Sequence, residues 1–244
     1  MSRKQLLQLL GFAILGVGLL LAVSNWPLFT ASEPTVTSSP SKIMPLGDSI
    51  TDGYHIPGGY RINLWHHLTE QDYAFDFVGS QRNGPPELPD KDHEGHSGWT
   101  ISEINAMIVP WLKKAQPDQI LLIIGTNDIL QNLNLAKIGE RLEQLIQAIW
   151  QQTPDVTLFV GSIPPIGDRS FIEPVEQYNQ QITQLVKQHQ QEGRDIYFVD
   201  LSEALEWTDL ADGVHPNRQG HDKMARVWAE AVLVHSSTEQ APSH

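Results

Sequence analysis

The sequence predicts one α/β domain, a three-layer α/β/α sandwich around a five-stranded parallel sheet. The first observation is that five short apolar runs alternate with segments of helical periodicity along the chain. Strands that alternate with helices favour a parallel sheet, covered on both faces by helices in right-handed crossovers. The second observation is the length of 244 residues, which is enough for one domain with a large core and short for two.

Short apolar runs bounded by polar or glycine-containing segments predict the strands, and apolar residues at helical spacing predict the helices. The five strands, in order, are residues 43–46, 75–79, 120–124, 156–161 and 196–199. The five helices are residues 62–69, 101–114, 135–151, 175–191 and 217–234. Thr100 and Glu103 have the spacing of a capping box, which predicts the start of the second helix.

The chain around this domain is predicted to carry a targeting segment. Arg3 and Lys4 precede an apolar stretch over residues 6–23, which is either a signal peptide or an uncleaved membrane anchor. A stretch rich in Ser, Thr and Pro follows and predicts a linker. We therefore expect the domain to be secreted, periplasmic or held on a membrane outside the cytoplasm. The predicted parts are residues 1–24 (targeting), 25–41 (linker), 42–235 (domain) and 236–244 (polar tail).

The composition excludes several classes of partner and chemistry. The formal charge is −13, and no basic cluster is present, which argues against nucleic acid and against docking on anionic membranes. Absence of cysteine excludes disulfides, thiolate metal sites and cysteine nucleophiles. We expect a monomer with a neutral or weakly charged substrate, touching a membrane only through its N-terminal segment if that segment is uncleaved.

Ser49 and His215 are the candidate nucleophile and base. Ser49 follows the first predicted strand, where open α/β folds place their chemistry, although a serine at such a turn often serves only as a helix cap. His215 follows the last predicted strand, and a histidine is suited to proton transfer at neutral pH. Asp212 lies three residues before it and is placed to orient the imidazole.

Two further segments offer donors for an oxyanion. Asn127 follows the third predicted strand, where its side-chain amide could face the carbonyl that Ser49 attacks. Gly98 precedes the capped helix, and its bare backbone N–H could approach the same oxygen, with Gly79 at the end of the second strand as its rival. The N–H of Ser49 itself is the third candidate donor. Trp99 is predicted either to stand at the rim of the site or to pack on the sheet.

Other polar residues are interpreted as structural. Asp92, His93 and His96 share one proline-rich loop, which is weak support for a metal site, so neither a metal nor another cofactor is expected. Arg61 is predicted to form a structural ion pair rather than to contact substrate.

The chain resembles the SGNH, or GDSL-type, hydrolases in residues 47–51, Gly98, residues 125–128 and residues 212–216. The resemblance implies a flavodoxin-like fold, with the nucleophile, acid and catalytic histidine on Ser49, Asp212 and His215. It also implies that Gly98 and Asn127 are the oxyanion glycine and asparagine. The insertion at residues 80–97 departs from the broad pattern of that family.

A narrower resemblance indicates the substrate. Residues 43–51, 60–61, 75–82 and 92–100 are similar to acetylxylan esterases of carbohydrate esterase family 3. This implies a serine esterase that removes acetyl groups from a carbohydrate such as acetylxylan. The alternatives are a lipase, thioesterase or lysophospholipase, because the same machinery serves long acyl chains, and a non-catalytic carbohydrate-binding relative, which the complete set of reactive residues disfavours.

Overall fold

The computed structural model describes residues 39–239 of the chain. The predicted targeting segment, most of the predicted linker and the last five residues of the predicted tail lie outside this range. The strands are β1 (Ser41–Gly47), β2 (Phe75–Phe77), β3 (Gln81–Arg82), β4 (Asp92–Gly95), β5 (Gln119–Ile123), β6 (Thr157–Gly161) and β7 (Ile196–Val199). The helices are α1 (Ser49–Asp52), α2 (Arg61–Glu70), α3 (Ile101–Ala115), α4 (Thr126–Leu130), α5 (Ile138–Gln152), α6 (Ile172–Gln191) and α7 (Arg218–Glu239).

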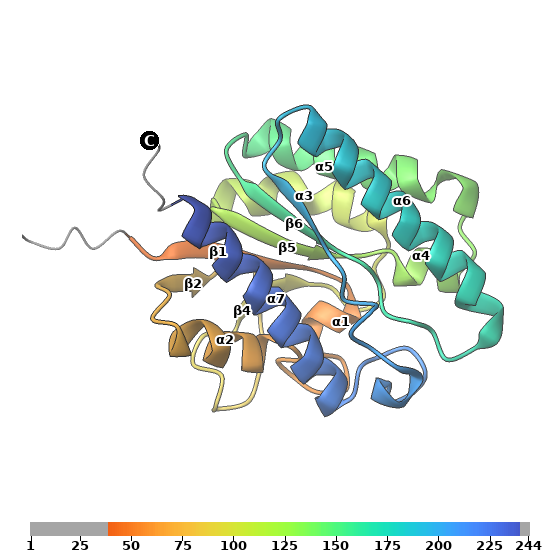
Figure 1. The fold of residues 1–244 in the computed structure, drawn as a ribbon, viewed down its shortest axis with the longest axis horizontal. Helices are drawn as coiled ribbons and strands as arrows, with labels where there is room; N and C mark the ends of the chain where they lie inside the picture. Colours follow the sequence, from red (N-terminus) through yellow and green to blue (C-terminus); the bar gives the residue numbers. More distant parts are fainter. Residues whose placement is uncertain (1–38, 240–244) are drawn as a thin grey trace, which may run out of the picture. The chain divides into compact units, whose positions relative to one another are not determined.

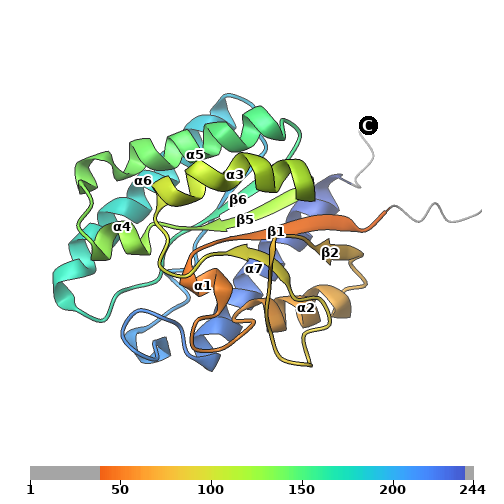
Figure 2. The ribbon, with the colours of Figure 1, turned by 180° about the vertical axis from the view of Figure 1, so that it is seen from behind.

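The sheet has the order β3-β4-β1-β5-β6-β7, and β2 also pairs with β1. All of these pairs are parallel except β3 with β4. Helices α2 and α7 pack together on one face, while α3, α5 and α6 cover the other (Figures 1 and 2). The predicted three-layer α/β/α fold is therefore confirmed.

The predicted number of strands is wrong, because β3 and β4 lie in the insertion that was expected to be loop. Strand β4 reads Asp-His-Glu-Gly and offers no apolar run or alternation, so its sequence gives no strand signal. It is nevertheless buried, because it pairs with the last two residues of β1. Strand β2 pairs with the first three residues of the same edge of β1, so the insertion interrupts one strand position.

The centre of the sheet is buried on both faces. Every residue of β5 and β6 is buried, as expected for parallel strands covered by helices on both sides. For that reason these strands are short apolar runs, without the alternation of apolar and polar residues that a half-exposed strand shows. Among residues 39–239, no helix combines the length and apolar character needed to cross a membrane.

The carboxyl ends of the strands meet at one edge of the sheet. At this edge β1 leads into α1 and β5 leads into α4, on the right in the view of Figure 1. Strand β4 ends there one turn before α3, and the segment after β7 returns to the start of α7. Four segments that are distant in the sequence are thus brought to one place.

Candidate active site

Ser49 is the first residue of α1, directly after β1. Asp48 caps this one-turn helix, because its Oδ1 accepts a hydrogen bond of 3.0 Å from the N–H of Ile50. Gly47 allows β1 to approach β5 closely, since a Cβ at this position would lie 2.2 Å from the carbonyl oxygen of Ile123. The turn therefore presents the Ser49 hydroxyl at the carboxyl edge of the sheet.

His215 and Asp212 complete a chain of hydrogen bonds that begins at Ser49. Nε2 of His215 lies 2.8 Å from Ser49 Oγ, and its Nδ1 lies 2.8 Å from Asp212 Oδ2. Because a carboxylate accepts, Nδ1 carries the proton and Nε2 is left to accept the serine proton. Asp212 Oδ1 accepts from the backbone N–H groups of Val214 and His215, which fixes the carboxylate within its own turn.

His55 is a second histidine on the same carboxylate, and the sequence did not indicate it. Its Nε2 lies 2.7 Å from Asp212 Oδ2, across a separation of 157 residues. Burial alone would raise the pKa of the Asp212 carboxyl, but hydrogen bonds from His215, His55 and Val214 outweigh burial and hold that pKa well below its usual range. Asp212 therefore stays ionised beside His215 throughout the neutral range.

His55, Asp212 and His215 also form a group of side chains, within residues 39–239, that could hold a metal ion. One ligand atom from each lies within 4.8 Å of the others, and two imidazoles with a carboxylate suit a zinc ion. An ion bound there would take Nδ1 of His215 away from Asp212, so it would disturb the triad rather than assist it. Absence of a metal from the reaction stays a prediction.

The three residues that the sequence analysis weighed for a metal site, Asp92, His93 and His96, have other partners. Asp92 pairs with Arg82, and the buried His93 accepts a hydrogen bond from a backbone N–H through Nδ1. The His96 ring stacks on both Trp99 and Trp111, with its centroid 4.5 Å from each, and the two indoles lie 5.8 Å from one another. Its Nε2 bonds to the buried Glu94. The Trp99 ring therefore packs against His96 of the insertion and Trp111 of α3, neither of which the sequence indicated, and its place at the rim of the site stays a prediction.

Gly98 lies in a tight turn whose ends are tied to the neighbouring strands. The N–H of Trp99 donates to the carbonyl oxygen of His96, and Gly98 has a φ of +83°, as the third residue of a type II turn requires. The N–H of His96 donates to the carbonyl oxygen of Gly47, so the turn adjoins the end of β1. The N–H of Gly98 makes no hydrogen bond within residues 39–239.

Asn127 is attached to this turn. Its Nδ2 donates to the carbonyl oxygen of Trp99 at 2.9 Å, which orients the amide and leaves its second N–H available. Ser49 starts α1, so its N–H has no partner inside the helix. The three predicted oxyanion donors thus come from the ends of the adjacent strands β4, β1 and β5.

Gly79 does not reach this edge. The N–H of the preceding Val78 donates to the carbonyl oxygen of Ile43, in the first half of β1. A Cβ on Gly79 would lie 2.0 Å from the carbonyl oxygen of His93, so glycine is needed where the chain passes close to β4. The geometry therefore favours Gly98 over its rival.

Replacing Gly98 by alanine is expected to lower kcat by roughly 10- to 100-fold, because the turn would relax away from positive φ and re-aim its N–H groups. A Cβ at Gly98 meets nothing within 4 Å, so crowding would not explain the loss. Gly193 has a φ of +81° and equally open space, which makes Gly193→Ala the matched control. Both variants should lose about 1 kcal/mol of stability in urea unfolding. If Gly98→Ala and Gly193→Ala had equal kcat values, Gly98 would not contribute to the oxyanion site.

Arg61 is structural, as predicted, but the predicted ion pair is wrong. The side chain is buried, and its N–H groups donate to the carbonyl oxygens of Thr51 and Lys91 and to Asn83. Within residues 39–239 no carboxylate lies within ion-pairing distance of Arg61. Arg61 therefore ties the helix that carries Ser49 to the insertion through backbone carbonyls, which a sequence pattern does not reveal.

A groove of about 700 Å³ borders the triad at residues 212–214. Its other wall is the segment after β6, residues 166–169, together with Leu130 and Phe171. Its lining combines apolar side chains with charged ones. The groove gives an extended substrate room beside the triad.

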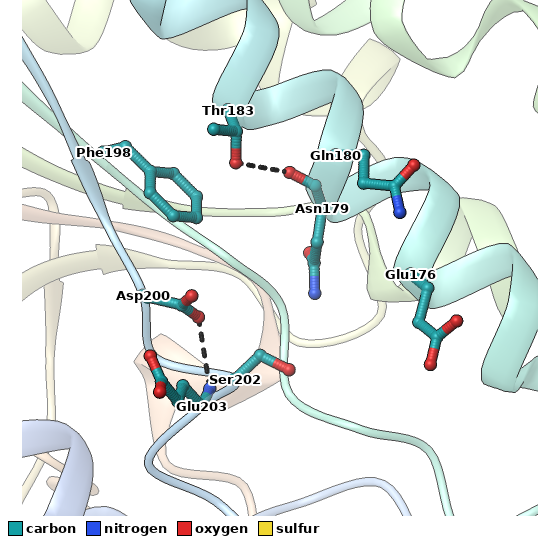
Figure 3. A pocket seen from close by; sticks show the side chains of 8 residues that line it. All are labelled: Glu176, Asn179, Gln180, Thr183, Phe198, Asp200, Ser202 and Glu203. Atoms are coloured by element: carbon teal, nitrogen blue, oxygen red, sulfur yellow. Dashed lines mark hydrogen bonds between the residues drawn. The ribbon is translucent and has the colours of Figure 1, made fainter.

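A second pocket lies away from the triad, between α6 and the segment after β7, and encloses about 350 Å³. Its Asn179 holds the backbone N–H and carbonyl oxygen of Ile163, and its Asp200 accepts from Ser162 and from the N–H of Glu203. These polar groups are occupied in supporting the loops. The lining residues are Glu176, Asn179, Gln180, Thr183, Phe198, Asp200, Ser202 and Glu203 (Figure 3).

Comparison with known proteins gives consistent similarities. Residues 46–223 match the model of the GDSL-like lipase/acylhydrolase family. A multidomain esterase of Ruminococcus flavefaciens is 31% identical over 261 residues, covering 95% of this chain and 34% of its own length. The chain thus spans about a third of that relative.

Two solved structures extend the similarity. A family 3 carbohydrate esterase of Clostridium thermocellum is 41% identical with a TM-score of 0.74, covering 82% of this chain and 99% of its own. A family 3 carbohydrate esterase of Talaromyces cellulolyticus is 28% identical with a TM-score of 0.71, covering 81% and 99%.

Proposed function

Because the chain belongs to the GDSL-like lipase/acylhydrolase family, we propose that it is a serine esterase that removes acetyl groups from a carbohydrate such as acetylxylan. The observation that carries the proposal is the hydrogen-bonded series from Ser49 through His215 to Asp212. An orienting acid, a base and a nucleophile in this order form the arrangement that activates a serine hydroxyl. The two family 3 carbohydrate esterases among the structural relatives support the carbohydrate as substrate.

The reaction is an acyl transfer to water in two halves. Nε2 of His215 takes the Ser49 proton as Oγ attacks the ester carbonyl, and Asp212 stabilises the resulting imidazolium. The N–H groups of Ser49 and Gly98 and the amide of Asn127 hold the oxyanion, and one such donor lowers the barrier by about 2.7–4 kcal/mol. His215 then protonates the alcohol oxygen as its C–O bond breaks. Water repeats the sequence on the acyl-enzyme and releases acetate.

A lipase, thioesterase or lysophospholipase would use the same residues on longer acyl chains, so the length of the acyl group is the property to test. In wild-type protein, kcat/KM for p-nitrophenyl esters is expected to be highest for acetyl and propionyl and to fall at least tenfold by octanoyl. Residues 39–244 are suited to this assay, because the described domain begins at residue 39 and β1 begins at Ser41. A maximum at long chains would replace the carbohydrate esterase by a lipid or thioester hydrolase.

Ser49→Ala provides the control for the assay. Hydrolysis of every ester is expected to fall to background in this variant while its circular dichroism stays unchanged. A non-catalytic carbohydrate-binding protein would show no Ser49-dependent turnover of any ester, and that result would overturn the enzymatic proposal.

We also infer that the enzyme works outside the cytoplasm as a monomer. The basis for the location is the sequence of residues 1–24, in which two basic residues precede an apolar stretch. Fractionation of cells that express the full chain tests the location, and light scattering of the purified protein tests the oligomeric state. Cytoplasmic protein or a stable dimer would contradict the respective part of this inference.

A further inference from the structure

Tyr54 is an exposed aromatic side chain directly beside the Ser49–His215 pair. Its ring centroid lies 5.0 Å from that of His215, with the ring planes inclined by 35°. The residue is 60% exposed, so much of its ring remains open to solvent. A single exposed apolar side chain is ordinary on a protein surface. This one lies against the catalytic base, where a bound substrate can contact it.

Residues close to Tyr54 in the sequence fix it in place. Its backbone N–H donates to the carbonyl oxygen of Ser49 at 3.1 Å, and Gly53 before it adopts a φ of +81°. The ring of His55 meets it edge to face at 4.7 Å, and His55 is itself held by Asp212 at 2.7 Å. A ring that is already ordered loses little conformational freedom when a ligand packs on it.

Two polar atoms around this ring are free. The Tyr54 hydroxyl and Nδ1 of His55 make no hydrogen bond with any part of the chain that the structure describes. Because Nε2–H of His55 donates to the ionised Asp212, its Nδ1 carries a lone pair that can accept. The surface therefore combines an open aromatic face with a hydroxyl and an acceptor nitrogen.

The proposed reaction places the leaving alcohol on this side of the site. His215 protonates the alcohol oxygen through Nε2, so the alcohol must lie against the imidazole that Tyr54 contacts. Building on the proposed function, we infer that Tyr54 and His55 form the leaving-group subsite. They bind a neutral pyranose ring, whose C–H face packs on Tyr54 while its hydroxyls bond to Tyr54 Oη and His55 Nδ1.

The chemistry of this surface favours a sugar over the other alcohols that esterases release. A simple alkyl alcohol has no hydroxyls for the two free polar atoms. A phosphate-bearing glycerol would approach the ionised Asp212 on a chain of net charge −13, which repels it. A pyranose presents apolar C–H groups on its face and hydroxyls at its edge, which matches both kinds of group without adding charge.

The test compares two acetate esters that differ only in the alcohol. Acetylated methyl β-xylopyranoside supplies a pyranose, and ethyl acetate supplies a small alkyl alcohol. Tyr54→Ala is expected to lower kcat/KM at least tenfold for the xyloside and less than threefold for ethyl acetate. Tyr54→Phe, the matched variant that keeps the ring and removes Oη, should lose no more than about fivefold on the xyloside. Retained turnover of ethyl acetate shows that each variant is folded and active.

The outcomes separate this inference from the proposed function. If wild-type protein cleaves both esters but Tyr54→Ala affects both equally or neither, the subsite assignment is overturned and the esterase stands. If wild-type protein cleaves neither ester, the esterase fails and the subsite falls with it. A loss in Tyr54→Phe as large as that in Tyr54→Ala would overturn the packing of the sugar face on the ring.

Discussion

Replacing His215 by alanine is expected to lower kcat on p-nitrophenyl acetate by on the order of 10⁶ while leaving the fold intact. Ser49 Oγ would lose the only imidazole bonded to it within residues 39–239, and without that base its hydroxyl is a poor nucleophile. The fold should persist because His215 lies in a surface loop outside the core, and Asp212 keeps its bonds to Val214 N–H and His55. Steady-state kinetics and thermal unfolding measure the two effects.

Two controls make this result specific. His66→Ala removes an exposed histidine from α2 that lies outside the site, and its kcat should equal that of wild type. Adding Ser49→Ala to His215→Ala should cause no further loss, because residues that act as one unit are not additive. Activity of His215→Ala within 100-fold of wild type would show that another group accepts the serine proton.

The parts of this molecule that follow a local rule were predictable from the sequence. Strands β1, β5 and β6 are short apolar runs because parallel strands buried on both faces need no polar residues. Thr100 and Glu103 form the expected capping box at the start of α3. Ser49 and His215 follow the first and last strands along the chain, and the sheet topology then brings Ser49 Oγ within 2.8 Å of His215 Nε2.

The parts that were missed depend on contacts between distant segments. His55 lies 157 residues from the carboxylate it binds, and nothing in its local sequence marks that partner. Strand β4 is polar in sequence and forms a strand only because the edge of β1 is free beside it. The exposed Tyr54 has meaning only through the histidine ring next to it. Such features become visible only when the chain is folded.

Asp48 combines a local feature with one that depends on the fold. In the sequence it stands next to the nucleophile Ser49, but its pKa is set by its burial in the folded protein. Its carboxyl is fully buried, and Oδ2 has no hydrogen-bond partner within the described part of the chain. Burial, with the nearby Asp128 carboxylate adding to it, raises the pKa of Asp48 to about 7, against the hydrogen bond from Ile50 that lowers it. The ionised form is therefore disfavoured in the folded protein.

This pKa determines how the stability of the folded protein changes with pH. Below about pH 4 the Asp48 carboxyl is neutral in both the folded and the unfolded chain and has no effect. Between pH 4 and pH 7 the folded chain binds the proton more tightly, so this group lowers stability as pH rises. Above pH 7 the loss is complete, and a shift of about three pH units corresponds to roughly 4 kcal/mol.

Asp48→Asn is therefore expected to stabilise the protein by up to about 4 kcal/mol at pH 8 and by only about 1 kcal/mol at pH 4.5. The amide keeps an oxygen to cap the N–H of Ile50 and cannot ionise. Urea unfolding of both proteins at the two pH values measures the difference, in which other titrating groups cancel. Asp155→Asn, at an exposed position before β6, is the control and should change stability little at either pH. An Asp48→Asn variant less stable than wild type at pH 8 would mean that the charged carboxylate is itself favourable under the nucleophile.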